Sequence, residues 1–160
     1  VDSVVHFSAL LSSIGEERPD VALQVNNIGT QNVLSLAARH NLAVFCPSTI
    51  GAFGPSTPLD RTPDLTVMRP TTIYGITKVH AELLGEYYNL KYGVDFRSLR
   101  LPGIISAESE PGGGTTDYAV AIFHHLFENP GQPFHCYLRE DTSLPMMEIG
   151  DCIGAITLRL

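Results

Sequence analysis

The sequence predicts a doubly wound α/β fold with a parallel sheet, and three observations lead to this fold class. Two short apolar runs, at 4–9 and 43–46, are typical of strands that are buried on both faces. Apolar residues recur at helical spacing at 19–39 and again at 71–92, and a third strand-like run occupies 95–101. Strands separated by helices of this length form βαβ units, whose strands pair in parallel.

The residues at the ends of these segments support their boundaries. Pro19 suits the first turn of a helix, and Gly93 suits the position just after the last turn of one. Pro102 and Gly103 terminate the third strand. Three further elements are expected toward the C-terminus, namely a helix at 115–128, a strand at 134–138 and the start of a helix at 152–160.

Composition limits the class of partner. The chain has 160 residues, 44% of them hydrophobic and 17% charged, which suits one globular domain that spans 1–160. The net charge is −7 and the lysines are Lys78 and Lys91 alone, so no basic stripe exists to bind nucleic acid or an anionic membrane. No run approaches the roughly 20 apolar residues of a membrane helix. Small molecules are therefore the expected partners.

Cysteines and histidines do not suggest a metal. Cys46, Cys136 and Cys152 lie in apolar segments without metal-ligand spacing, which indicates free, buried and inert thiols in a reducing compartment. His124 and His125 are adjacent, whereas helical metal ligands would stand four apart. We expect no metal site.

Tyr74 and Lys78 form the first pattern with a chemical meaning. They stand four residues apart on the helix predicted at 71–92, so their side chains share one face. A tyrosine has a pKa of about 10, and a neighbouring ammonium favours the phenolate, so this pair can supply a base. The ammonium can also hold the hydroxyls of a ribose. The same spacing recurs at Tyr87 and Lys91, which provides an internal control.

Sequence context separates the two pairs. Tyr74 lies 25 residues after Thr49, a hydroxyl residue that follows the strand predicted at 43–46, at the carboxyl end where open α/β sheets bind ligands. Tyr87 lies equally far after Thr62, in a polar loop. On an ideal helix, 13 positions rotate Tyr87 by about 220° from Tyr74, so the two cannot serve one site. We expect Tyr87 to pack in the core.

Thr49, Tyr74 and Lys78 resemble the Ser/Thr, Tyr and Lys triad of short-chain dehydrogenases. The segment Asn-Asn-Ile-Gly-Thr at 26–30 resembles the Asn-Val-x-Gly-Thr segment of the extended branch of that family, with an Asn in place of the usual Val. The resemblance implies a Rossmann-like NAD(P)-binding domain. That domain is incomplete here, because the sequence lacks the N-terminal strand-loop-helix units that carry a glycine-rich pyrophosphate loop.

Further segments narrow the resemblance to the L-threonine 3-dehydrogenases of this branch, especially the animal form. These segments are 12–16, 47–55, 69–75, 111–120 and 144–147. The resemblance implies that NAD oxidises the C3 hydroxyl of L-threonine to 2-amino-3-oxobutanoate. Tyr74 would take the proton and Thr49 would orient the reacting oxygen. Lys78 would tune Tyr74 and bind the ribose.

The resemblance also implies which residues contact the two ligands. Besides Tyr74 and Lys78, cofactor contacts are expected from Ser8, Ala9, Leu10, Asn26, Leu101, Pro102 and Ile104. Besides Thr49 and Tyr74, substrate contacts are expected from Ser12, Thr115 and Thr116, within substrate-binding elements at about 105–149. A helix that opens after the glycines at 112–114 would offer free N–H groups and its dipole to the threonine carboxylate. The alternative is that Thr115 only caps that helix.

Two other functions stay open on the sequence alone. One is a nucleotide-sugar epimerase or dehydratase of the same fold, and the other is a catalytically silent relative that serves as a binding module. The resemblance further implies a homodimer, with a mitochondrial location for an animal protein and a cytoplasmic one for a bacterial protein. Because the pyrophosphate loop is missing, we expect this chain alone to be inactive and to show no micromolar binding of NAD in a calorimetric titration.

Overall fold

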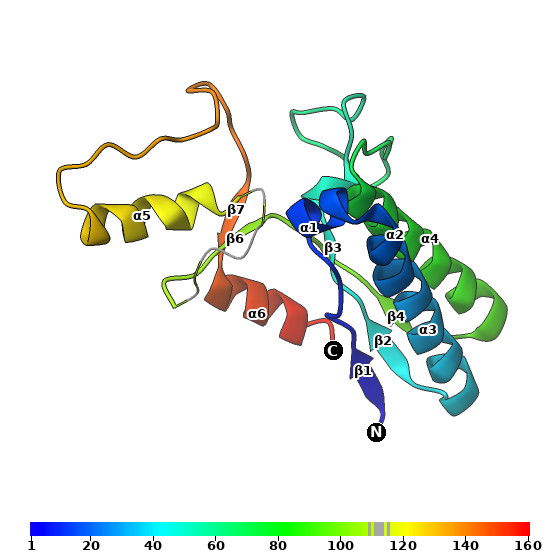
Figure 1. Ribbon diagram of the computed structural model, residues 1–160. Helices are drawn as coiled ribbons and strands as arrows, with labels where there is room; N and C mark the ends of the chain where they lie inside the picture. Colours follow the sequence, from blue (N-terminus) through cyan, green and yellow to red (C-terminus); the bar gives the residue numbers. More distant parts are fainter. Residues whose placement is uncertain (109, 111–113, 115) are drawn as a thin grey trace.

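A parallel three-stranded sheet lies at the centre of the molecule. The structure is a computed structural model that describes residues 1–108, 110, 114 and 116–160. The sheet has the order β1-β2-β4 (Figure 1). Its strands are β1 (Ser3–Val5), β2 (Ala43–Phe45) and β4 (Phe96–Arg97). Val44 pairs with Val4 on one side and with Phe96 on the other, so β2 is the middle strand.

A second parallel pair, β3 (Ser48–Thr49) with β5 (Arg100–Leu101), continues the ladder beyond a break. Only Cys46 and Pro47 separate β2 from β3, and a proline has no N–H to give to a ladder. The backbone N–H of Ser48 nevertheless donates to the Leu99 carbonyl at 2.9 Å. The pairing therefore continues past Pro47, and Thr49 is the last residue of β3.

Two long helical segments cross over between the strands, as predicted. The first is continuous and consists of α2 (Pro19–Ala22), η1 (Leu23–Ile28) and α3 (Gly29–His40), where η1 is a π-helical turn. The second is α4 (Ile73–Tyr92). The Thr72 hydroxyl caps the start of α4 by accepting from Gly75 N–H at 3.1 Å, and Gly93 ends the helix in the left-handed conformation, with φ of 70°.

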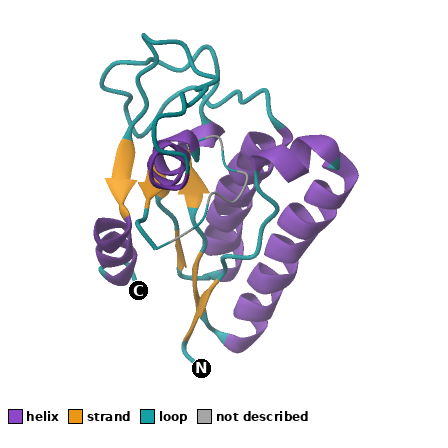
Figure 2. Ribbon diagram, turned by 60° about the vertical axis from the view of Figure 1, so that its left-hand side comes forward, coloured by secondary structure: helices purple, strands orange, loops and turns teal. Residues whose placement is uncertain are grey.

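Helices lie on both sides of the strands. α3 and α4 lie on one side, whereas α6 (Ile149–Thr157) lies on the other, as Figures 1 and 2 show. Apolar side chains of α3 and β2, with Val94 just before β4, pack into a fully buried core between helix and sheet; they are Leu34, Ala37, Val44 and Val94. The predicted doubly wound α/β fold is confirmed, with every strand pair in the described part of the chain parallel.

The C-terminal third of the chain is more open. A third parallel pair joins β6 (Gly103–Ile105) to β7 (Met146–Glu148), and α5 (Tyr118–Glu128) with a long loop lies between them in sequence. None of the described residues of α5 is fully buried. The short helix α1 (Ser12–Glu17) follows β1 and packs against α4.

Several predicted boundaries were wrong. The first strand ends at Val5, so Ser8 to Leu10 form a loop, and 134–138 is a loop instead of a strand. The helix predicted from 115 begins at Tyr118, and the one predicted from 152 begins at Ile149. Neither α1 nor the β6–β7 pair was predicted from the sequence.

The thiols only partly match the prediction. Cys46 and Cys152 are buried, but Cys136 is exposed in the loop after α5, so it is not a packed thiol. Burial raises the pKa of both buried thiols, which suits an inert role. Within the part of the chain that the structure describes, no helix has the length and apolar character of a membrane span.

Candidate active site

Thr49, Tyr74 and Lys78 lie together at the carboxyl end of the sheet. The segment from Pro47 to Thr49 runs along the first turns of α4. The Lys78 ammonium donates to the Pro47 carbonyl at 2.8 Å, and Thr49 and Tyr74 line the same two cavities, where the Thr49 hydroxyl acts to lower the pKa of Tyr74. The structure thus brings the three predicted catalytic residues into one cluster, which the four-residue spacing on α4 alone could not establish.

The local geometry of Thr49 directs its hydroxyl toward Tyr74. Thr49 caps η2 (Ile50–Ala52), a single 3₁₀ turn, and its Oγ1 accepts from Gly51 N–H at 3.1 Å. This bond leaves the Thr49 O–H available as a donor toward the Tyr74 oxygen. A donated hydrogen bond of this kind stabilises the phenolate more than the phenol.

Gly75 allows the start of α4 to approach η2 closely. A Cβ at this position would lie 2.2 Å from the Gly51 carbonyl oxygen and 2.6 Å from the Pro70 Cβ. Glu16 of α1 adds a second contact at this helix end, since its carboxylate accepts from Ile73 N–H at 2.7 Å. The close approach places Tyr74, the next residue after Ile73, directly beside Thr49.

Burial governs the titration of both α4 groups. It raises the pKa of Tyr74, and the hydrogen bond from Thr49 only partly opposes the rise. It lowers the pKa of Lys78, which is 7% exposed. The sequence led us to expect that Lys78 would lower the pKa of Tyr74. In this structure burial is the largest cause of the shift in the pKa of Tyr74, and Lys78, whose ammonium lies 5.6 Å from the centre of the ring, is not among the causes.

A cavity of about 570 Å³ opens on one side of Tyr74. Ser12, Thr49, Tyr74 and Thr116 line it, four of the residues predicted to contact the substrate. Sequence reasoning missed the other contributors, which come from the loop after η2 and from the long loop after α5; they include Phe53, Pro55, Tyr137, Thr142 and Leu144. The loop residues carry no periodic pattern, so only a family comparison of these loops could have indicated them.

A second cavity, of about 380 Å³, is lined by the same tyrosine. Among the predicted cofactor residues, those that line it are Ala9, Tyr74, Lys78, Leu101, Pro102 and Ile104. α6 closes it with Ile149, Cys152, Ile153 and Ile156, none of which was predicted. Thr49, Tyr74 and Pro102 line both cavities, so the two spaces meet beside the Thr49 and Tyr74 hydroxyls.

Asn26 supports the loop after β1 instead of facing the larger cavities. Its amide oxygen accepts from Leu10 N–H at 2.8 Å, and its amide nitrogen donates to the Leu10 carbonyl at 3.2 Å and to Thr77 Oγ1 at 3.0 Å. With 4% exposure, the side chain acts as a brace between the β1 loop and α4. Ser8 lines only a small void beside Asn26, and Leu10 is held by its backbone. Ser8, Leu10 and Asn26 were all predicted to contact the cofactor. They line neither of the two larger cavities and instead support the residues that do.

The predicted carboxylate site at the start of α5 differs from the expectation. Thr115 lies outside the described residues. The helix begins at Tyr118, and the carboxylate of Asp117 accepts from Gly114 N–H at 2.8 Å. The Asp117 carboxylate therefore already accepts from a backbone N–H that was predicted to bind the carboxylate of the substrate. Thr116 still faces the substrate-side cavity, where it packs on Gly103, whose missing Cβ would lie 2.7 Å from the Thr116 methyl.

The control pair on α4 has a different environment. Lys91 donates directly to the Tyr87 hydroxyl at 2.7 Å, and Tyr87 is 46% exposed. The prediction that Tyr87 packs in the core was wrong, because the ring lies on the surface among Tyr88 and Tyr92. The prediction that it belongs to another site than Tyr74 is consistent with this position.

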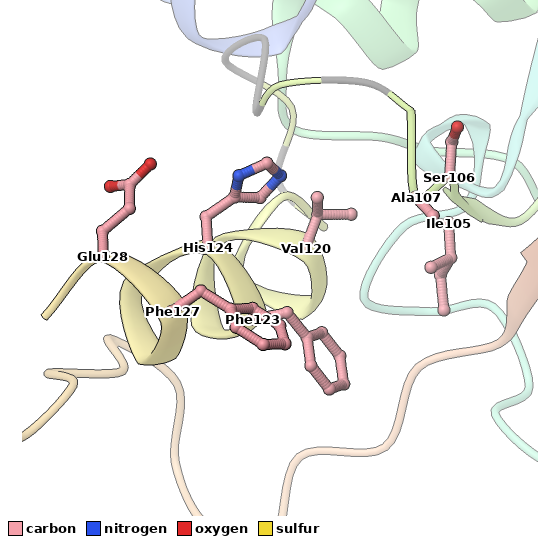
Figure 3. A pocket seen from close by; sticks show the side chains of 8 residues that line it. All are labelled: Ile105, Ser106, Ala107, Val120, Phe123, His124, Phe127 and Glu128. Carbon is pink, nitrogen blue, oxygen red and sulfur yellow. The ribbon is translucent and has the colours of Figure 1, made fainter. Parts of the chain in front are cut away.

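Another cavity, of about 440 Å³, lies along α5 and is mainly apolar (Figure 3). Val120, Phe123 and Phe127 line it from the helix and Ile105 lines it from β6. None of the predicted catalytic or ligand-binding residues borders this cavity. It is therefore separate from the cluster around Tyr74.

Comparisons with known proteins agree with this site. The chain is 61% identical over 150 residues to the protein named L-threonine 3-dehydrogenase, mitochondrial, of Bos taurus, a match that covers 94% of this chain and 40% of the relative. It is 48% identical over 155 residues to an uncharacterized epimerase/dehydratase of Staphylococcus saprophyticus, covering 97% of this chain and 48% of the relative. The chain thus spans less than half the length of these curated relatives.

Solved structures give the same result. The crystal structure of L-threonine dehydrogenase from Phytophthora infestans matches with a TM-score of 0.94 and 58% identity, over 98% of this chain and 50% of that chain. The model of the NAD dependent epimerase/dehydratase family matches residues 1–137, which include the whole catalytic cluster. The chain therefore belongs to the NAD dependent epimerase/dehydratase family.

Proposed function

We propose that this chain holds the catalytic centre of an NAD-dependent L-threonine 3-dehydrogenase, which oxidises the C3 hydroxyl of L-threonine to 2-amino-3-oxobutanoate. The observation that carries the proposal is the position of the Thr49 and Tyr74 hydroxyls, which lie where two cavities meet. A dehydrogenase needs adjoining spaces for substrate and cofactor, because the hydride passes directly from one to the other while the base reaches the substrate hydroxyl. The names of the bovine and Phytophthora relatives support threonine as the substrate.

The cavity closed by α6 fits the nicotinamide end of NAD. Leu101, Pro102 and Ile104 provide a flat apolar wall, and Lys78 provides a buried ammonium whose donors suit ribose hydroxyls. When bound there, NAD supplies the acceptor for a hydride. The family name supports a nicotinamide cofactor in general, and NAD in particular is our proposal.

The residues of this chain provide the proton chemistry. As a phenolate, Tyr74 accepts the proton of the C3 hydroxyl, while the C3–H bond breaks with its electron pair and a C=O bond forms. Thr49 holds the same oxygen by hydrogen bonding and keeps the Tyr74 phenolate stabilised. The bond from Lys78 to Pro47 holds its ammonium beside the Tyr74 ring, at 5.6 Å from the ring centre.

The segment at about 105–149 is the proposed source of substrate contacts. Thr116, Tyr137, Thr142 and Leu144 come from this segment and line the cavity on the substrate side. The polar groups among them suit a zwitterionic amino acid. With Ser12 from α1, they enclose the side of Tyr74 that faces away from α6.

Location and assembly are part of the proposal as well. The name of the bovine relative supports a mitochondrial location, and the staphylococcal relatives leave a cytoplasmic one for a bacterial source. We also propose a homodimer for the full-length protein. Cell fractionation and sedimentation equilibrium would test these two statements independently of the activity.

The decisive assay measures NADH formation by the full-length protein with L-threonine, and in parallel with UDP-glucose. We expect NADH and 2-amino-3-oxobutanoate with threonine and no conversion of the nucleotide sugar. Epimerisation of UDP-glucose without threonine oxidation would establish the alternative enzyme. Binding of NAD without either reaction would establish a silent relative.

A further inference from the structure

Glu82 is a buried carboxylate on α4 to which the proposed reaction gives no part. It follows Tyr74 and Lys78 at the same spacing of four residues, so all three side chains lie along one stripe of the helix. Glu82 is only 7% exposed. A carboxylate that is buried to this degree needs partners for its oxygens, and these partners indicate what it holds in place.

Four hydrogen bonds reach the two oxygens of Glu82. The Ser48 hydroxyl donates to Oε1. Arg100 donates from Nε to both oxygens, at 3.0 and 3.1 Å, and from Nη2 to Oε2 at 2.7 Å. Arg100 is itself fixed, since it also donates to the Asp64 carbonyl at 2.7 Å and its guanidinium lies 5.7 Å from the centre of the Phe53 ring.

The two partners of Glu82 are neighbours across the β3–β5 ladder. Ser48 pairs with Arg100, and the next pair in register is Thr49 with Leu101. Glu82 therefore hydrogen-bonds both members of the Ser48–Arg100 pair, which directly precedes the pair of Thr49 with Leu101. On the partner strand the following residue, Leu101, lines the cofactor-side cavity.

Consecutive residues of one segment are thus each held by α4. Lys78 holds the Pro47 carbonyl, Glu82 holds the Ser48 hydroxyl, and Tyr74 contacts Thr49. The first two contacts involve no reacting atom. Together they determine how closely the end of the strand approaches the helix, and so where the Thr49 hydroxyl lies relative to Tyr74.

We propose that Glu82 is a positioning residue, whose carboxylate acts through Ser48 and Arg100 to hold the Thr49 hydroxyl against Tyr74. The kinetic consequence of this inference rests on the proposed dehydrogenase function. The hydrogen bonds of Glu82 do not depend on that function, because they join residues of this chain to one another.

The contact has a measurable effect on Tyr74. The hydrogen bond from Thr49 lowers the pKa of Tyr74, so losing it raises that pKa further. The other groups that face Tyr74 are Cys46 from the sheet side and Lys78 on α4, and Glu82 is not among the causes of the shift. Asp64 and Glu86 act on Arg100. Removal of a negative charge would by itself lower the pKa of a tyrosine, so a rise identifies lost positioning.

Two variants of the full-length protein test the proposal. Glu82→Gln keeps the shape of the side chain without its charge, and Ser48→Ala removes only the link to the strand while the pair with Arg100 remains. With 3-fluorotyrosine incorporated, ¹⁹F NMR follows the titration of Tyr74, which a Tyr74→Phe sample assigns. We expect the pKa of Tyr74 to rise in both variants, because the hydroxyl of Thr49 no longer opposes the effect of burial. We expect kcat for threonine oxidation to fall about ten- to hundredfold, with KM for NAD within about twofold.

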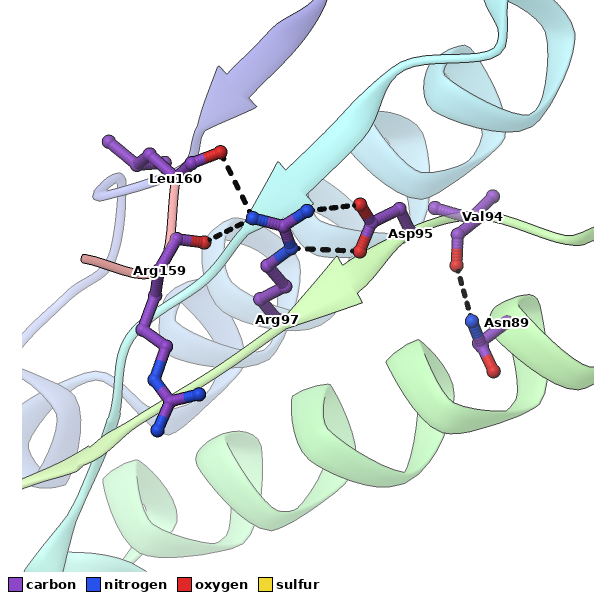
Figure 4. A network of polar contacts seen from close by, with 6 residues as sticks. All are labelled: Asn89, Val94, Asp95, Arg97, Arg159 and Leu160. Carbon is purple, nitrogen blue, oxygen red and sulfur yellow. Dashed lines mark hydrogen bonds and ion pairs between the residues drawn. The ribbon is translucent and has the colours of Figure 1, made fainter. Parts of the chain in front are cut away.

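Asp95→Asn is the matched control. Asp95 accepts two hydrogen bonds from Arg97 of β4, at 2.9 and 2.5 Å (Figure 4), but this pair is exposed, and neither residue lines the two cavities beside Tyr74. This change should leave the Tyr74 titration and the kinetics as they are in the parent.

An unmoved Tyr74 titration, with only a lower melting temperature in both variants, would overturn the proposal and make Glu82 a stabilising residue alone. If Glu82→Gln does not fold, Ser48→Ala decides by the same criterion. If the parent does not oxidise threonine, the proposed function is wrong. The NMR titration of Tyr74 still tests the positioning role of Glu82, because it does not depend on turnover.

Discussion

The helix α4 carries two tyrosine–lysine pairs at the same spacing, and they differ in almost every physical respect. Tyr74 and Lys78 lie near its start, where Lys78 is 7% exposed and bonds a backbone carbonyl of the neighbouring strand segment. Tyr87 and Lys91 lie near its end, where Tyr87 is 46% exposed and Lys91 donates to the Tyr87 hydroxyl beside the Tyr92 ring. Burial lowers the pKa of Lys78, whereas the bond to Tyr87 raises the pKa of Lys91.

The difference teaches that spacing on a helix brings two groups together but does not make a site. The first pair becomes a candidate base because other elements meet it, namely the β3 segment with Thr49, the turn at Gly51 and the apolar wall at Leu101. The second pair lies on the surface of α4 instead, where Tyr87 is exposed to solvent. Its hydrogen bond is that of an exposed pair, which contributes little to stability.

The largest expected effect separates the pairs directly. Tyr74→Phe removes the proton acceptor and keeps the ring, so kcat for threonine oxidation by the full-length protein should fall about 10²–10⁴-fold. Steady-state kinetics measures this loss. Tyr87→Phe is the control and should leave kcat unchanged. A Tyr74→Phe protein that retains more than half the parent rate would remove Tyr74 from the mechanism.

The next test distorts the first site while a matched change leaves it alone. Gly75→Ala and Gly85→Ala both add a methyl group to a crowded face of α4, at 2.2 Å from the Gly51 carbonyl oxygen and from the Phe96 ring, respectively. Both should lower the free energy of unfolding by about 1–3 kcal/mol, as measured by urea denaturation. Only Gly75→Ala separates Tyr74 from Thr49, so only it should reduce kcat, by about ten- to hundredfold. Equal kinetic losses in the two variants would show that rigidity alone matters.

The pH dependence sharpens the comparison further. Burial raises the pKa of Tyr74, so the phenolate that acts as base is the minor form near neutrality. Below that pKa its fraction, and with it kcat/KM, should increase about tenfold per pH unit. A profile recorded from about pH 6 upward checks this. A kcat/KM that is flat or falls with rising pH would mean that another group accepts the proton.

The smallest expected effect concerns substrate recognition. Thr116→Val keeps the branched shape beside Gly103 and removes a hydroxyl that lines the substrate-side cavity. The loss of one hydrogen bond should raise KM for threonine by up to about tenfold and leave KM for NAD unchanged. If both constants stay constant and only the melting temperature falls, Thr116 is a structural residue.

The sequence predicted the central sheet and α4 well, because these elements are determined by local patterns. Apolar β-branched runs such as Val44 and its neighbours mark buried strands, and Gly93 marks the helix end by its left-handed backbone. The cluster of Thr49, Tyr74 and Lys78 was predictable for the same reason, since a strand end and a helix face converge in a βαβ unit.

Longer-range features could not be predicted in this way. The β6–β7 pair depends on two segments about forty residues apart, Gly103–Ile105 and Met146–Glu148, and neither has a strong strand pattern. Asn26 was assigned to the cofactor, but its partner Leu10 is a backbone contact that no side-chain pattern reveals. Tyr87 was expected in the core because its apolar ring was read without knowledge of which face of α4 the sheet covers.

The most direct test of the central claim follows the hydrogen atom at C3. The full-length protein is incubated with NAD and L-threonine that carries deuterium at C3, and the reduced cofactor is examined by mass spectrometry. The account predicts NADH that carries the deuterium, formed by the parent and by Tyr87→Phe and essentially not formed by Tyr74→Phe. Unlabelled NADH, or labelled NADH formed by Tyr74→Phe at the parent rate, would contradict it.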